Sequence, residues 1–178
     1  MIRIIVINGY AGVGKDEFVK ACQKQYGNVY NLSMIDSIKN IAKKIGWDGK
    51  KDDNGRRFLS DLKDALTRYD DIPFKAIKKQ IDMIAKENSS QKTYIFIHAR
   101  EPEDIQRLVE EFNAFTLLIR RAQVEQKNYG NHADANVLNY QKYDYIYLNN
   151  GDLKTLSKDV KDFIKVVDKF GSKYEVQE

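Results

Sequence analysis

The sequence has few of the residues that would build disulfides, rigid turns or a metal cluster. Its 178 residues include one cysteine, two prolines and two histidines, and no apolar stretch approaches the length of a membrane span. A lone cysteine, Cys22, forms no internal disulfide, so a disulfide-stapled domain is excluded. The N-terminus resembles a strand rather than a secretory signal. We expect a cytoplasmic protein without a membrane partner, in a host cytoplasm if the gene comes from a phage.

The sequence also lacks a large excess of charge of either sign. Lys and Arg number 30 and Asp and Glu number 26, which leaves a net charge of +4 with acids and bases interspersed. A dedicated nucleic-acid surface usually has a denser basic stripe, so nucleic acid is not the expected partner. The balance favours small anionic ligands. The sequence leaves the oligomeric state open, a dimer included.

The sequence does have a glycine-rich segment directly after its first apolar run. Residues 9–16 read Gly-Tyr-Ala-Gly-Val-Gly-Lys-Asp, which is the phosphate-binding pattern G-x-x-x-x-G-K with Asp16 where Ser or Thr is usual. Glycines let backbone N–H groups crowd around a polyphosphate, and a following helix points its positive end at the same anion. A chance glycine turn is the alternative, and the full spacing disfavours it.

From this pattern we predict a nucleotide site that holds ATP. The residues expected to bind it are Gly9, Tyr10, Ala11, Gly12, Val13, Gly14, Lys15 and Asp16. Lys15 would supply a charge to the β- and γ-phosphates, and Asp16 is the expected metal residue for Mg²⁺.

The rest of the chain alternates strand and helix patterns. Strands are predicted at residues 2–7, 29–33, 94–98, 115–120 and 143–148, and helices at 16–25, 34–45, 58–69, 74–86, 102–112 and 153–170. This order predicts an α/β fold: a three-layer, doubly wound parallel sheet of about five strands, of the P-loop NTPase type. We expect one domain over residues 1–170 and a frayed polar tail at 171–178.

Ligands of such sheets bind beyond the carboxyl ends of the strands, so the residues there are candidates. Asp36 follows the second strand, and residues 46–59 are predicted to be a mobile loop that leads into a helix. Arg56, Arg57 and Arg68 are predicted to bind an acceptor phosphate, because guanidinium groups match phosphate oxygens. Ordinary surface charge is the alternative for each. Residues 52–55 also fit the D-x-x-G of GTPases, but no strand precedes them and no N-K-x-D motif exists.

The third and fourth predicted strands end in basic residues. After the third come His98 and Arg100, where most P-loop enzymes have an acidic residue that helps to hold Mg²⁺. We predict that Arg100 binds the acceptor phosphate, and a structural role stays open for His98. Arg120 and Arg121 begin a polar excursion over residues 120–141. We interpret it as a lid that closes over the transferring phosphoryl group, with a plain surface segment as the alternative.

Together these features resemble the phage and bacterial deoxynucleoside monophosphate kinases. The resemblance rests on Gly14-Lys15-Asp16, the Gly-Arg-Arg-Phe-Leu run at 55–59, Arg100 and Arg120-Arg121, and extends from residue 2 to about residue 170. These kinases belong to the nucleoside monophosphate kinase group, which includes the animal-type phosphomevalonate kinases with a similar G-K-D loop. Relatives often have Asp-x-Arg where this chain has His98-Ala99-Arg100.

The resemblance implies transfer of the γ-phosphoryl group of ATP, with Mg²⁺, to the phosphate of a (deoxy)nucleoside monophosphate. It also implies an acceptor-binding insert at about 34–88. The predicted catalytic residues are Lys15, Arg100, Arg120 and Arg121, and the predicted substrate-binding residues are Asp36, Arg56, Arg57, Arg68 and Arg100. The alternatives are a nucleotide-binding regulatory protein without catalysis, a nucleic-acid-stimulated ATPase, and a kinase of a non-nucleotide acceptor such as phosphomevalonate.

Overall fold

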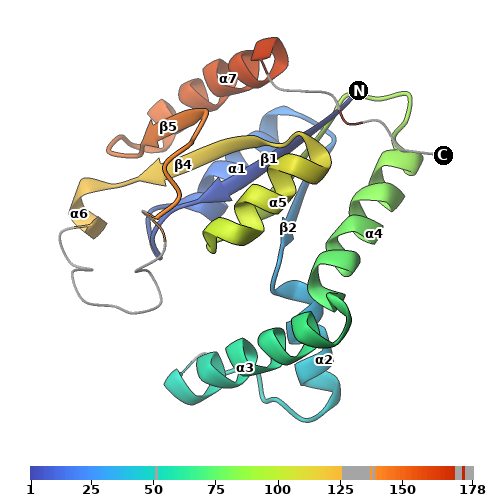
Figure 1. Ribbon diagram of the computed structural model, residues 1–178. Coiled ribbons are helices and arrows are strands. Elements are labelled where there is room, and N and C mark those ends of the chain that lie inside the picture. The colour runs from blue at the N-terminus through green and yellow to red at the C-terminus, as the bar shows by residue number, and fades with distance from the viewer. Residues whose placement is uncertain (51, 126–136, 138, 171–173, 175–178) are drawn as a thin grey trace. The chain divides into compact units, whose positions relative to one another are not determined.

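The structure, a computed structural model, describes residues 1–50, 52–125, 137, 139–170 and 174. Strands and helices alternate along the chain except after β2, where the three helices α2, α3 and α4 follow in succession (Figure 1). The strands are β1 (Ile2–Asn8), β2 (Val29–Ser33), β3 (Thr93–His98), β4 (Phe115–Arg120) and β5 (Tyr145–Leu148). The helices are α1 (Lys15–Gln25), α2 (Asp36–Lys44), α3 (Asp53–Asp70), α4 (Ile72–Glu87), α5 (Pro102–Phe112), α6 (Ala122–Glu125) and α7 (Leu153–Phe170).

The five strands form one sheet in the order β2-β3-β1-β4-β5. β1 pairs in parallel with both β3 and β4, and β4 pairs in parallel with β5. β1 is central and buried along its whole length, as its mostly apolar sequence predicts for a parallel strand covered on both faces. The predicted α/β fold with a parallel sheet of five strands is confirmed.

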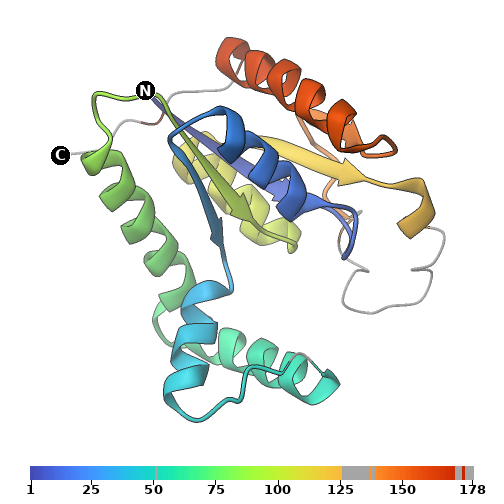
Figure 2. The same ribbon diagram turned by 180° about the vertical axis from the view of Figure 1, so that it is seen from behind.

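Helices cover both faces of this sheet. α1 and α7 contact each other on one face, and α5 lies against β1 and β4 on the other (Figures 1 and 2). The rings of Phe18 on α1 and Phe163 on α7 pack edge to face, with centroids 5.2 Å apart. Burial of each such side chain contributes about 1.5–3 kcal/mol, so the α1–α7 layer fixes where α1 begins. The register sets Ile7 beside His98 and Asn8 beside Leu118, so the carboxyl ends of three strands share one edge.

Contacts divide the chain into two compact units. One comprises Met1–Asn31 with Asn88–Glu178, and the other is Leu32–Glu87. Within the second unit, α2, α3 and α4 contact one another around a small core of Ile38, Ala42 and Leu59. The insert expected at 34–88 has nearly the bounds of this unit, while its role in binding an acceptor stays a prediction.

The second unit corrects the expectation of a mobile loop over residues 46–59. α3 already begins at Asp53, five residues before the predicted start, because the side chain of Asp52 caps it and accepts a 2.8 Å hydrogen bond from the Gly55 N–H. Gly55 is buried, and a Cβ there would lie 2.2 Å from the Lys50 carbonyl oxygen. The D-x-x-G spacing at 52–55 is therefore a helix cap in this protein.

Other boundaries differ from the expectation by one or two residues, and one helix is additional. β5 begins at Tyr145 rather than at residue 143, because the Asp144 carboxylate accepts hydrogen bonds from the N–H and the hydroxyl of Thr116, at 2.7 and 2.8 Å. The four-residue helix α6 was not expected, since a single turn is too short to show a periodic pattern.

The predicted tail includes one residue with defined contacts. Tyr174 forms an antiparallel bridge with Ile2, and its ring packs edge to face on Phe112 at a centroid distance of 5.4 Å. The other tail residues, 171–173 and 175–178, lie outside the described residues. Among the helices that the structure describes, none combines the length and the apolar character needed to cross a membrane.

Candidate functional site

The loop between β1 and α1 has three glycines with positive φ: Gly9 at 146°, Gly12 at 82° and Gly14 at 98°. A Cβ at Gly9 would lie 2.4 Å from the Ile119 carbonyl oxygen, so the close approach of β4 requires glycine there. Gly14 takes the left-handed conformation at the N-terminal end of α1. The loop thus turns sharply around the positive end of a helix, which is the geometry of an anion site.

Lys15 lies over this loop rather than extending into solvent. Its Nζ donates hydrogen bonds to the carbonyl oxygens of Gly9 and Tyr10, at 2.5 and 2.8 Å. These carbonyls hold the ammonium group at the concave side of the loop, where phosphate oxygens can replace them as stronger, charged acceptors. The structure therefore brings the predicted lysine and the predicted glycines together.

A buried asparagine anchors the start of the loop. Asn8, the last residue of β1, is fully buried, and its Oδ1 accepts a 2.7 Å hydrogen bond from the Gly9 N–H. Its Nδ2 donates to the hydroxyl of Tyr143 at 2.7 Å and lies 3.5 Å from the Val137 carbonyl oxygen. Burial raises the pKa of the Tyr143 hydroxyl to about 12, so this group is protonated at neutral pH and can donate to Val137, 3.4 Å away.

A second buried asparagine anchors the end of the loop. Asn149 follows β5, and its Nδ2 donates a 2.7 Å hydrogen bond to the Val13 carbonyl oxygen. Its backbone N–H donates a 2.8 Å hydrogen bond to the carbonyl oxygen of Arg120. A Cβ on Gly14 would lie 2.4 Å from the same Nδ2. Asn149 therefore ties β5 to the last turn of the loop.

Sequence reasoning missed Asn8, Asn149 and Tyr143. A signal existed for the two asparagines, since each is a polar residue directly at the end of an apolar strand run. For Tyr143 no local signal exists, because its partner Asn8 lies 135 positions away in the sequence.

At the end of β3, His98 lies between Asn31 and Asp16. Its Nε2 is 2.8 Å from Asn31 Oδ1 and 3.6 Å from Asp16 Oδ1. The His98 side chain is 18% exposed, whereas that of Asp16, in the first turn of α1, is 76% exposed. His98 thus faces the phosphate loop from the neighbouring strand, in the place where an acidic residue is usual.

Asp16 fits a role as a magnesium ligand. Mg²⁺ in kinase sites keeps several waters and uses one or two carboxylates together with substrate phosphates. An exposed carboxylate one position after Lys15 meets that need without a larger protein cage. In the part of the chain that the structure describes, no group of three or more His, Cys, Asp or Glu forms a metal site by itself.

The two arginines predicted to open the lid differ in their surroundings. Arg120 is 42% exposed, and its guanidinium binds the Glu125 carboxylate in a fork, with its shortest contact at 2.7 Å. The hydrogen bond with Arg120 lowers the pKa of Glu125, and the same bond raises the pKa of Arg120. Arg121 is half-buried. Residues 126–136 and 138 of the predicted lid lie outside the described residues.

The predicted acceptor-binding residues divide between the two units, with Arg100 in the first and the others in the second. Arg100 is exposed just beyond the end of β3. In the second unit, Asp36 forms an ion pair with Lys39 at 3.2 Å, and Arg57 lies 4.0 Å from Asp61. Arg68 follows Arg57 by eleven positions on α3, and at 1.5 Å per residue that separation is about 16 Å along the axis. The helix therefore does not bring Arg56 and Arg57 together with Arg68.

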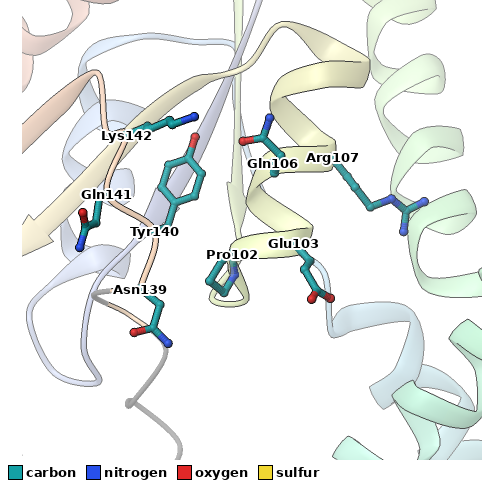
Figure 3. A pocket seen from close by; sticks show the side chains of 8 residues that line it. All are labelled: Pro102, Glu103, Gln106, Arg107, Asn139, Tyr140, Gln141 and Lys142. Atoms are coloured by element: carbon teal, nitrogen blue, oxygen red, sulfur yellow. The ribbon is translucent and has the colours of Figure 1, made fainter.

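An open groove of about 770 Å³ lies between the first turns of α5 and the segment before β5 (Figure 3). Its lining residues include Pro102 and Gln106 from α5 and Asn139, Tyr140 and Gln141 from the other side. The ring of Tyr140 is buried and packs edge to face on Tyr143, with centroids 5.0 Å apart. Three carboxamides and an aromatic ring can bind a planar polar group. None of these residues was predicted from the sequence.

No protein-family model matches this chain, and neither does any curated protein sequence. Among solved structures, the chain is similar to a sugar kinase from Janibacter sp. HTCC2649, with a TM-score of 0.53 and 13% identity over 97% of this chain and 100% of that one. It is also similar to the dephospho-CoA kinase from Campylobacter jejuni, with a TM-score of 0.52 and 12% identity over 95% of this chain and 98% of that one. At such identities the similarity shows a shared fold alone, an α/β fold with a parallel sheet of five strands.

Proposed function

We propose that the protein transfers the γ-phosphoryl group of ATP to a small phosphorylated acceptor, and that this acceptor is a (deoxy)nucleoside monophosphate. The observation that carries the proposal is the loop at residues 9–15, in which three positive-φ glycines surround the Lys15 ammonium group at the carboxyl edge of a parallel sheet. This geometry suits a nucleoside triphosphate, because a glycine loop, a helix N-terminus and the ammonium group of one lysine lie next to one another.

In-line phosphoryl transfer needs two phosphates held end to end while the charge on the moving group is neutralised. In the proposed mechanism the loop and Lys15 hold the donor phosphates. Asp16 would hold Mg²⁺, which when bound neutralises charge on the β- and γ-phosphates. Arg100, at the end of the strand next to β1, would bind the acceptor phosphate, and Arg121 would stabilise the transferring group. Arg120 can do the same only after it leaves Glu125.

The choice of acceptor rests on two supports. The resemblance to deoxynucleoside monophosphate kinases favours a nucleotide. The groove beside α5 adds three carboxamide side chains, which can pair with the polar edge of a base, next to the Tyr140 ring. The sugar kinase and the dephospho-CoA kinase share only the fold and leave the acceptor open. Arg56, Arg57 and Arg68 remain predicted acceptor ligands.

The test is ADP release from ATP and Mg²⁺ in the presence of each ribo- and deoxynucleoside monophosphate in turn. We expect turnover that depends on one or a few of these acceptors. The panel also includes phosphomevalonate and acceptor-free reactions. Turnover with phosphomevalonate alone would refute the nucleotide acceptor and keep the kinase. If none of the acceptors in the panel supports turnover, the proposed reaction is refuted.

One observation favours a second candidate, a regulatory protein that binds a nucleotide without turnover. His98, and not a carboxylate, faces the loop from β3, with its Nε2 2.8 Å from Asn31 Oδ1. This candidate predicts ATP binding by the wild-type protein together with no ADP release across the whole panel.

A further inference from the structure

The start of the phosphate loop is held from two sides. On one side Lys15 Nζ binds the carbonyl oxygens of Gly9 and Tyr10. On the other side Asn8 Oδ1 accepts from the Gly9 N–H, and Asn8 Nδ2 donates to the Tyr143 hydroxyl, each at 2.7 Å. The carboxamide of Asn8 is therefore used at both ends, and its orientation is set by the tyrosine.

The hydrogen bonds from Lys15 and those from Asn8 respond differently to a bound phosphate. Two of the three N–H groups of Lys15 donate to the loop carbonyls in the structure, so a phosphate that binds the ammonium group competes with these carbonyls for it. The loop then loses one of its restraints when the ligand arrives. The contact from Asn8 remains available, because it uses the Gly9 N–H from within the sheet, where Asn8 is fully buried.

We propose that Tyr143 is a positioning residue for the phosphate loop: its hydroxyl orients the Asn8 carboxamide, which holds Gly9 in the conformation that binds the nucleotide. Gly9 needs this support because glycine has the most conformational freedom of any residue, so contacts must select its φ of 146° among the accessible conformations. The inference rests on the proposed function, since it assumes that the loop binds nucleotide phosphates.

Tyr143 also connects the loop to the wall of the groove. Its ring packs on Tyr140, which lines the groove, and its hydroxyl lies 3.4 Å from the Val137 carbonyl oxygen. A shift of the segment before β5 would therefore move the hydroxyl that orients Asn8. The Tyr140–Tyr143 pair therefore connects the phosphate loop with the groove. A conformational change at one of these sites would be transmitted to the other through this pair.

The test compares Tyr143→Phe with a matched control, Tyr147→Phe. Tyr147 is also buried, and its hydroxyl donates a 3.0 Å hydrogen bond to Asp159 on α7, on the opposite face of the sheet. Each variant keeps the aromatic ring and loses one buried hydroxyl with its hydrogen bond. Isothermal titration with ADP and with ATP and Mg²⁺ gives the nucleotide Kd, and thermal unfolding gives the Tm.

We expect Tyr143→Phe to raise the nucleotide Kd about five- to tenfold, because Asn8 loses a buried partner. Tyr147→Phe should lower the Tm at least as much as Tyr143→Phe does and leave the Kd within about twofold of wild type. If Tyr143→Phe lowers the Tm but keeps the wild-type Kd, its role is structural only and the inference is wrong.

A double-mutant cycle tests the route through Asn8. In the Asn8→Ala background, Tyr143→Phe should change the Kd less than about twofold, because the residue it orients is gone. A full five- to tenfold change in that background would overturn the inference. Absence of nucleotide binding by the wild-type protein would overturn the proposed function itself, whereas equal Kd values for wild type and Tyr143→Phe would overturn only the positioning role.

Discussion

At the scale of single residues, the phosphate loop depends on two buried asparagines and on glycines that no other residue replaces without strain. Asn8 holds the N–H of Gly9, and Asn149 holds the carbonyl of Val13. Two buried carboxamides therefore hold the loop, one at the end of β1 and one directly after β5. Buried amides used in this way cost several kcal/mol when left unpaired, so each must keep its partner.

Gly14→Ala should destabilise the protein more than Gly46→Ala. Both glycines have positive φ, 98° and 104°, but a Cβ at Gly14 would lie 2.4 Å from Asn149 Nδ2, while nothing lies within 4 Å of a Cβ at Gly46. The strain of the left-handed conformation costs about 1 kcal/mol or more in both variants. Displacement of the Asn149 hydrogen bond adds about 1 kcal/mol in Gly14→Ala alone. Urea unfolding measures the difference, and equal losses of stability would contradict this account of Asn149.

At the scale of helices and strands, periodicity predicted which elements exist, and side-chain hydrogen bonds decided where several of them begin. α5 and α7 start and end where the pattern predicts. Pro102 marks the first turn of α5 and Phe112 its end, while α7 has an apolar residue at each end. α3 begins five residues early since Asp52 caps it, and β5 begins two residues late since Asp144 bonds to Thr116. These contacts follow from local chemistry that an apolar pattern does not record.

The same distinction applies to the candidate site. Its central part, Gly9 to Asp16, could be predicted because one continuous segment contains the whole pattern. Asn149 has a local signal, because it stands at the end of an apolar strand run, but its contact with Val13, 136 positions away, could not be predicted. Tyr143 has no local signal, because its partner Asn8 lies 135 positions away. The pairing of Arg120 with Glu125 was missed for a different reason. The partners are only five positions apart, but the lid hypothesis gave a role to the arginine and none to the glutamate.

At the scale of the whole molecule, buried and half-buried tyrosines make the fold sensitive to high pH. Burial raises the pKa of six of them: Tyr26, Tyr94, Tyr140, Tyr143, Tyr145 and Tyr147. Tyr94 and Tyr147 also donate to carboxylates, on Asp168 and Asp159, which raises the pKa further. Ionised phenolates would therefore be less stable in the folded protein than in the unfolded chain.

The free energy of unfolding should be constant with respect to these groups below pH 10 and fall above it. Unfolded tyrosines lose their protons near pH 10, whereas the folded ones keep theirs to higher pH, so above pH 10 the unfolded state binds fewer protons and is favoured as pH rises. Urea unfolding at intervals from pH 8 to pH 11.5 measures this slope. The Tyr143→Phe variant should show a shallower fall than wild type, because that group reaches a pKa of about 12 in the fold. A flat profile above pH 10 would contradict the assignment.

The most direct test of the central claim is the affinity of the loop for ATP with and without Lys15. Isothermal titration of ATP and Mg²⁺ would be made with the wild-type protein, Lys15→Ala and a control, Lys20→Ala. Lys20 lies on the same helix, is exposed and forms an ion pair with the exposed Glu17 at 2.7 Å. The account predicts that Lys15→Ala weakens binding about 10- to 100-fold, because a charged hydrogen bond to phosphate is lost, and that Lys20→Ala binds as wild type does. Equal affinities for wild type and Lys15→Ala would contradict the account.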